Sequence, residues 1–107
     1  MDTSICPKFE KATDLLSKKW SSLIIYQLLN GTKRFSELQK EIKVSGKMLS
    51  ERLKWLEEEK IIQRHVYPEI PIRIEYELTE KGKSLEPILN ALSQWSDQWI
   101  QIKPETI

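Results

Sequence analysis

The side chains best suited to chemistry in this chain lie on one segment, VSGKMLSERLKWL, at residues 44–56. Its hydroxyl, ammonium, guanidinium and carboxylate groups can donate to or accept from the base edges and phosphates of nucleic acid. Lysine can donate to the acceptors of guanine, and glutamate can accept from the amino group of cytosine. The candidate DNA contacts of this segment are Ser45, Lys47, Ser50, Glu51, Arg52 and Lys54.

The spacing of the same segment predicts a helix with one buried and one exposed face. Leu49, Leu53 and Leu56 recur at i, i+4 and i+7, so they form one stripe, and most polar positions fall on the other side. Ser45 is suited to be the N-cap, and Val44 and Leu49 have the spacing of a hydrophobic staple. One face is therefore expected to pack against the protein core, and the other is expected to be available for binding DNA.

The angle of Arg52 on this helix places it nearer the packed edge than the other polar residues. It can support the helix or reach a backbone oxygen rather than a base. For the whole polar face, an ordinary solvent-exposed surface is the alternative interpretation, so the neighbouring elements must decide.

A short helix and a tight turn are predicted directly before this segment. After a loop at 31–34, Ser36 can cap a helix that ends near Ile42. Three residues, 43–45, then separate it from the longer helix. Two helices joined in this way form a helix-turn-helix.

Two strands are predicted after the same segment. The apolar period approaches two over 61–67, and residues 72–78 alternate apolar and charged. Pro68 and Pro71 between them remove ladder donors and stiffen the tip. A β-hairpin after a helix-turn-helix is a wing, so the expected fold is mainly α with a β-hairpin wing (α+β), a winged helix-turn-helix.

Helical spacing also predicts flanking helices over 8–17, 19–29 and 84–102. Ser84 can cap the last of these, with Pro87 in its first turn, where a missing N–H costs little. This helix carries more apolar surface than a small winged-helix core covers.

The length of 107 residues predicts a single domain, residues 1–107. Within it we expect a helix-turn-helix and wing at 33–78, and dimerisation arms and helices at 1–18 and 84–107. The expected assembly is a homodimer.

Charge along the chain is consistent with a DNA-binding centre. The formal net charge is only +1, but residues 33–73 hold ten Lys and Arg against seven Asp and Glu. Lys33, Arg34 and Ser36 stand where the first helix of the pair crosses the phosphate backbone, and Arg73 lies on the wing. Surface cations that only aid solubility are the alternative for these positions.

Several classes of function lack their usual signals. One cysteine excludes an internal disulfide, and Cys6 with His65 cannot form a Cys/His zinc site within one chain, so we expect no metal or cofactor. No apolar stretch approaches the ~20 residues that span a bilayer, and a signal peptide is lacking, so a cytoplasmic protein is expected. Neither a base and nucleophile pair nor a glycine-rich phosphate loop suggests an enzyme.

An ordered set of motifs runs along nearly the whole chain. They are CP at 6–7, KW at 19–20, KRFSEL at 33–38, KMLSERL at 47–53, LE at 56–57, VYPEIP at 66–71 and EYELTEKG at 75–82. In this order they resemble the HxlR-type winged helix-turn-helix transcriptional regulators of bacteria. Gly46 stands where a glutamine is frequent in that family, so the operator of a relative does not transfer to this chain.

The early Cys6-Pro7 resembles the thiol-based, quinone- and electrophile-responsive branch of that family. The resemblance implies repression of detoxification genes and release when the cysteine is modified. With one cysteine in the chain, alkylation, an inter-subunit disulfide and a mixed disulfide are the available chemistries. From the residues alone, Cys6 can equally be a free structural thiol in an irregular arm.

The leading hypothesis is therefore a homodimeric repressor that binds double-stranded DNA at a near-palindromic operator and responds to quinones or other electrophiles at Cys6. Two alternatives stay open. The chain can be a winged-helix module for protein–protein interaction, because a fold does not determine a function. It can also be an HxlR-type activator without thiol sensing.

Overall fold

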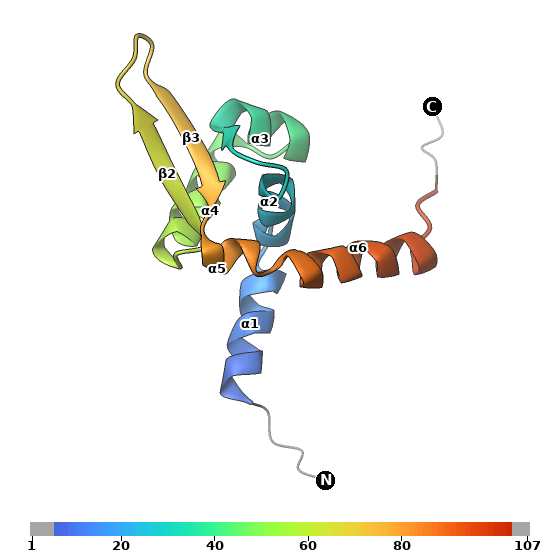
Figure 1. Ribbon diagram of the computed structural model, residues 1–107. Helices are drawn as coiled ribbons and strands as arrows, with labels where there is room; N and C mark the ends of the chain where they lie inside the picture. Colours follow the sequence, from blue (N-terminus) through green and yellow to red (C-terminus); the bar gives the residue numbers. More distant parts are fainter. Residues whose placement is uncertain (1–5, 104–107) are drawn as a thin grey trace.

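The computed structural model describes residues 6–103, and Figure 1 shows how its elements are arranged. A body of helices and a small sheet carries two helices, α1 and α6, that project from it in different directions. In chain order, the elements are α1 Pro7–Ser17, α2 Ser21–Leu28, β1 Lys33–Arg34, α3 Phe35–Ile42, α4 Gly46–Glu58, β2 Ile62–Tyr67, β3 Arg73–Leu78, α5 Glu80–Lys83 and α6 Glu86–Trp99. The predicted winged helix-turn-helix is confirmed.

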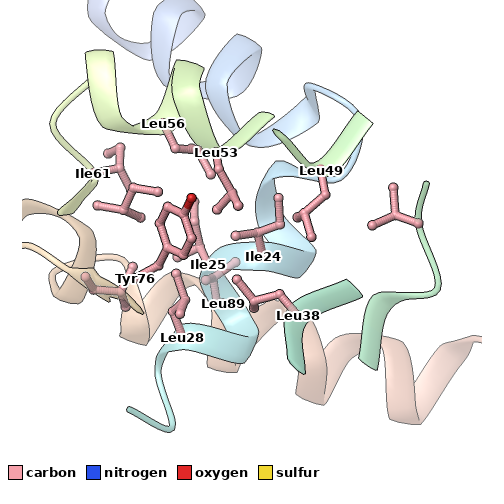
Figure 2. Packing of buried hydrophobic residues seen from close by; sticks show 13 residues of the cluster. Ile24, Ile25, Leu28, Leu38, Leu49, Leu53, Leu56, Ile61, Tyr76 and Leu89 are labelled. Carbon is pink, nitrogen blue, oxygen red and sulfur yellow. The ribbon is translucent and has the colours of Figure 1, made fainter. Parts of the chain in front are cut away.

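The core forms where α4 meets α2. Leu49, Leu53 and Leu56 are at most 1% exposed, which confirms the predicted stripe. Figure 2 shows them pointing from α4 into a cluster that includes Ile24 and Ile25 of α2, both fully buried. Because burying each such side chain is worth about 1.5–3 kcal/mol, this contact fixes the rotation of α4 about its own axis.

The wing is an antiparallel hairpin of β2 and β3, in which Gln63 pairs with Glu77 and His65 with Glu75. A third strand, β1, pairs with the other edge of β3 and gives the order β1-β3-β2. The loop expected at 31–34 is therefore wrong at Lys33 and Arg34. Two residues are too few to show a period, and this strand exists because β3 offers an unpaired edge.

The predicted cap of α3 is also wrong. The helix begins at Phe35, one residue before Ser36, and Arg34 is the N-cap. Glu37 accepts a hydrogen bond from the Arg34 backbone N–H at 2.9 Å. Since β1 delivers Arg34 to the helix in an extended conformation, the carboxylate at the third helical position replaces the serine.

The C-terminal helix is divided and ends earlier than expected. Ser84 does not cap it but donates to the Lys81 carbonyl at 2.6 Å, at the end of the short α5. α6 starts at Glu86 with Pro87 in its first turn, as predicted, and ends at Trp99 rather than at residue 102. The short α5 has its own N-cap, Thr79, whose side chain accepts from the Gly82 N–H.

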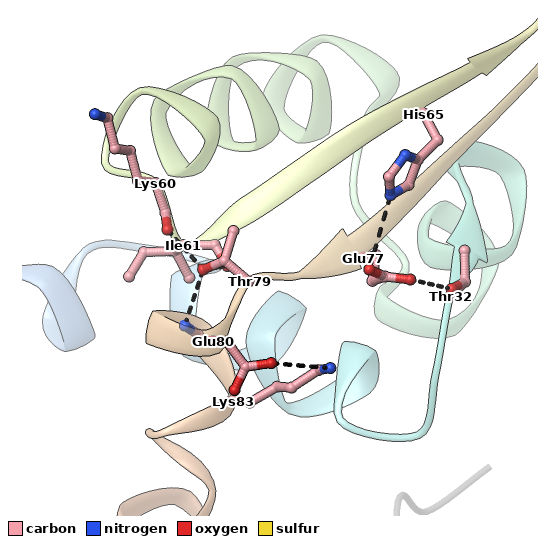
Figure 3. A network of polar contacts seen from close by, with 9 residues as sticks. Thr32, Lys60, Ile61, His65, Glu77, Thr79, Glu80 and Lys83 are labelled. Carbon is pink, nitrogen blue, oxygen red and sulfur yellow. Dashed lines mark hydrogen bonds and ion pairs between the residues drawn. The ribbon is translucent and has the colours of Figure 1, made fainter.

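Thr79 joins the wing to α5 and to the end of α4 (Figure 3). Its hydroxyl donates to the Lys60 carbonyl at 2.7 Å and accepts from the Gly82 N–H at 3.2 Å. Its own N–H donates to the Ile61 carbonyl at 3.0 Å. Gly82 lies against Ile61, just before β2, and Leu78, at the end of β3. A Cβ on Gly82 would collide with the Ile61 carbonyl oxygen and stand 2.9 Å from Leu78 Cδ2.

We predict that Gly82→Ala lowers the free energy of unfolding by about 1–3 kcal/mol, because the added methyl group overpacks a site bounded by backbone. Chemical denaturation measures this change. Gly46→Ala is the matched control: its Cβ would be 3.5 Å from Gln39 Nε2, an ordinary contact, so stability should be unchanged or slightly higher. Equal stability of the Gly82 variant and wild type would contradict the packing described here.

Candidate nucleic-acid interface

The turn between α3 and α4 holds the second helix in place. Lys43 ends α3 in a left-handed conformation with φ of 58°, and three residues separate the two helices, as predicted. Ser45 is the N-cap of α4, and its hydroxyl accepts from the Met48 N–H at 3.2 Å. Val44 and Leu49 are both buried in the same core cluster, as the predicted staple requires. α4 therefore enters the body at a fixed angle.

The face of α4 opposite its leucines is exposed and polar. Lys47, Ser50, Glu51 and Lys54 are all exposed. Within residues 6–103, their side chains make no hydrogen bond or ion pair. Ser45 is exposed too, with its hydroxyl used for the cap. The structure thus brings five of the six sequence-predicted residues of α4 to one accessible surface.

Arg52, the sixth, is engaged inside the fold. Its Nε donates to the Lys19 carbonyl at 2.7 Å, and its guanidinium lies 5.8 Å from the centre of the Trp55 ring. These contacts are consistent with one of the roles expected from the sequence, in which Arg52 supports the helix. Sequence reasoning missed the partner, because Lys19 is 33 positions away and no periodicity connects the two.

The predicted residues at the start of α3 also include both exposed side chains and one with a partner inside the protein. Arg34 and Ser36 are exposed. Lys33, by contrast, forms an ion pair with Glu41 at 2.9 Å, and its side chain is only 16% exposed. Lys33 therefore links β1 to α3, while Arg34 and Ser36 are free to face outward.

Arg73 is held at the base of the wing tip. Its guanidinium lies 3.3 Å from Glu69 and 3.9 Å from Glu75, and 4.2 Å from the centre of the Tyr67 ring. Two carboxylates offset its charge, and the aromatic ring fixes its plane. These contacts stiffen the wing.

Cys6 is exposed and is the N-cap of α1. Its carbonyl accepts from the Glu10 N–H at 2.9 Å, and Pro7 occupies the first helical position. The thiol therefore lies at the amino end of an 11-residue helix and is open to solvent-borne reagents.

Among residues 6–103, no group of three or more His, Cys, Asp and Glu side chains is arranged to hold a metal ion. In the same range, no helix combines the length and the apolar character needed to cross a bilayer.

The chain is similar to known proteins in both sequence and fold. The model of the HxlR-like helix-turn-helix family matches residues 15–104. The uncharacterized HTH-type transcriptional regulator YvaP of Bacillus subtilis strain 168 is 56% identical over 99 residues, which are 92% of each chain. The HTH-type transcriptional regulator YodB of the same organism is 45% identical over 102 residues, 94% of this chain and 91% of YodB.

Solved structures of similar proteins have the same fold. The reduced form of B. subtilis YodB superimposes with a TM-score of 0.79 at 44% identity, covering 94% of this chain and 100% of YodB. The quinone-bound form of YodB gives 0.76, covering 89% and 100%. The oxidized form of the redox regulator HypR gives 0.84 at 34% identity, covering 91% and 100%. With a matching family model and relatives of this similarity, the chain belongs to the HxlR-like helix-turn-helix family of transcriptional regulators.

Proposed function

We propose that this protein is a homodimeric transcriptional repressor that binds a near-palindromic operator and is released when Cys6 is modified. The observation that carries this proposal is the capped α4, whose leucines are buried and whose opposite face presents polar side chains without partners among residues 6–103. A helix of this kind after a three-residue turn is the element that enters the major groove. A cytoplasmic location is part of the same proposal.

On DNA, the residues have different roles. Lys47, Ser50, Glu51 and Lys54 face base edges and nearby phosphates, and the amino end of α4 at Ser45 favours a phosphate. Arg34 and Ser36, exposed at the start of α3, contact the backbone and hold the register. Lys33, Arg52 and Arg73 support these elements through their contacts within the protein.

The unpaired apolar surface of α6 supports the homodimer. Leu89 is the buried residue of this helix, whereas Leu92, Trp95 and Trp99 are 54%, 56% and 64% exposed. Leu23 of α2 is a further exposed apolar side chain, 51% exposed. A monomer seldom leaves so many large apolar side chains in water. A two-fold partner covers them and sets two α4 helices about one turn of DNA, roughly 34–36 Å, apart.

Cys6 is the proposed sensor, because it is exposed at the start of α1 and because YodB, 44% identical, has a solved quinone-bound form. The thiolate adds to a ring carbon of the quinone and forms a carbon–sulfur bond. The proton on that carbon then moves to one ring oxygen, and the other ring oxygen takes a proton from water, which yields a hydroquinone thioether. A loss of about 3 kcal/mol in DNA binding lowers affinity roughly a hundredfold.

We predict that Lys47→Ala and Lys54→Ala each weaken binding to an operator duplex selected from a random library, by about 1–3 kcal/mol where a base contact is lost. A lost phosphate contact also reduces the slope of log Kd against log salt by about one. Fluorescence anisotropy at several salt concentrations measures both. Lys83→Ala on α5 is the control and should bind as wild type does. Absence of saturable duplex binding by wild type would favour a protein–protein module.

A second pair of variants separates the neighbours Lys33 and Arg34. Arg34→Ala should reduce the salt slope by about one, because an exposed phosphate contact is removed. Lys33→Ala should leave that slope unchanged, because its charge is already paired with Glu41. The reverse pattern would show that the ion pair opens on DNA and that our assignment of the two residues is wrong.

Cys6→Ser should bind the operator with wild-type affinity and lose the response to a quinone or to diamide, since the modified atom is absent. The measurement is operator affinity of both proteins before and after treatment, with mass spectrometry to locate the adduct. If the variant is released as readily as wild type, Cys6 is not the sensor. If treatment raises wild-type affinity, the protein is not a repressor released by modification.

A further inference from the structure

The orientation of α1 is not set by burial within the chain. None of its residues is buried, and Phe9 is 66% exposed. Leu15 and Leu16, near its carboxyl end, are partly buried and pack against the core. In Figure 1 the remainder of the helix projects away from the body. The direction of α1 therefore depends on contacts at its carboxyl end.

Two contacts of the residues directly after α1 are made to α4. Arg52 Nε donates to the Lys19 carbonyl at 2.7 Å. One residue earlier, Lys18 Nζ lies 4.9 Å from the centre of the Trp55 ring, on whose surface the Arg52 guanidinium also rests. Arg52 and Trp55 both belong to the helix that we assign to the major groove. The junction after α1 is thus tied directly to the DNA-binding element.

The backbone of this junction is strained. Trp20 adopts a left-handed conformation with φ of 74°, which a bulky residue rarely does. Next to it, the Ser21 hydroxyl is fully buried and has no hydrogen-bond partner among residues 6–103. Such a conformation persists only where surrounding contacts hold it, and strain of this kind is frequent at switches. The Arg52 hydrogen bond is one of the contacts that hold it.

We propose that Arg52 is a positioning residue that couples α1 to α4, so that a movement of α1 changes how α4 meets DNA. Cys6 lies at one end of this 11-residue helix and the Arg52 contact at the other, about 16 Å away along the axis. A modification that displaces the amino end of α1 is transmitted through the Lys19 carbonyl. The inference rests on the proposed function and specifies the path by which Cys6 acts.

The test compares Arg52→Ala with Lys54→Ala, which removes one positive charge from the exposed face of the same helix. Both are assayed for operator affinity before and after quinone treatment and for the dependence of affinity on salt. We expect Arg52→Ala to keep the wild-type salt slope and to reduce the effect of the quinone from about a hundredfold to less than tenfold. Lys54→Ala should bind more weakly in both states, with the full quinone effect and a salt slope smaller by about one.

A full quinone effect in Arg52→Ala would overturn the inference. A salt slope reduced as much as in Lys54→Ala would also overturn it, because that reduction would mean that Arg52 contacts a phosphate. If Arg52→Ala does not unfold cooperatively, Lys18→Ala replaces it. The ammonium of this exposed lysine lies 4.9 Å from the centre of the Trp55 ring, and its loss should weaken the quinone effect in the same direction. A wild-type protein that binds DNA but ignores the quinone refutes the proposed sensing itself, a result distinct from uncoupling in the variant.

Discussion

Burial of the leucine stripe of α4 is the contact on which the remainder of the structure depends. Leu49, Leu53 and Leu56 pack against α2, and this packing leaves only one face of α4 for anything else. The stability of the core and the orientation of the proposed DNA-binding face therefore depend on the same contacts. A change that rotates α4 by about half a turn would bury its lysines and expose its leucines.

Some cationic residues around this core make contacts within the protein and others are exposed, and residue type alone does not distinguish the two groups. Lys33, Arg52 and Arg73 hold β1, the α1–α2 junction and the wing through Glu41, the Lys19 carbonyl and Glu69. The exposed cations on α4 and at Arg34 are free of such contacts within residues 6–103. In our proposal, this division is how a chain of net charge +1 presents a cationic surface to DNA.

Periodic features could be predicted from the sequence, and features that depend on distant partners could not. The stripe of α4 and the cap at Ser45 are local and agree with the structure, and the predicted alternation of 72–78 is present in β3 from Glu75 to Leu78, whereas Ile72 lies before the strand and is exposed. β1 forms only because β3 has a free edge, and Arg52 turns inward because the Lys19 carbonyl is there. Gly82 belongs to a motif that the sequence shows. The need for glycine at this position comes from the nearby Ile61 carbonyl, a contact between segments distant in sequence.

A structure of the protein bound to its selected operator would test the central claim most directly. Our account predicts two copies of the chain, each with α4 in the major groove, Lys47 and Lys54 within hydrogen-bonding distance of bases or phosphates, and Arg52 still donating to the Lys19 carbonyl. A complex in which α4 faces away from the duplex, or in which Arg52 leaves its carbonyl to contact DNA, would contradict it.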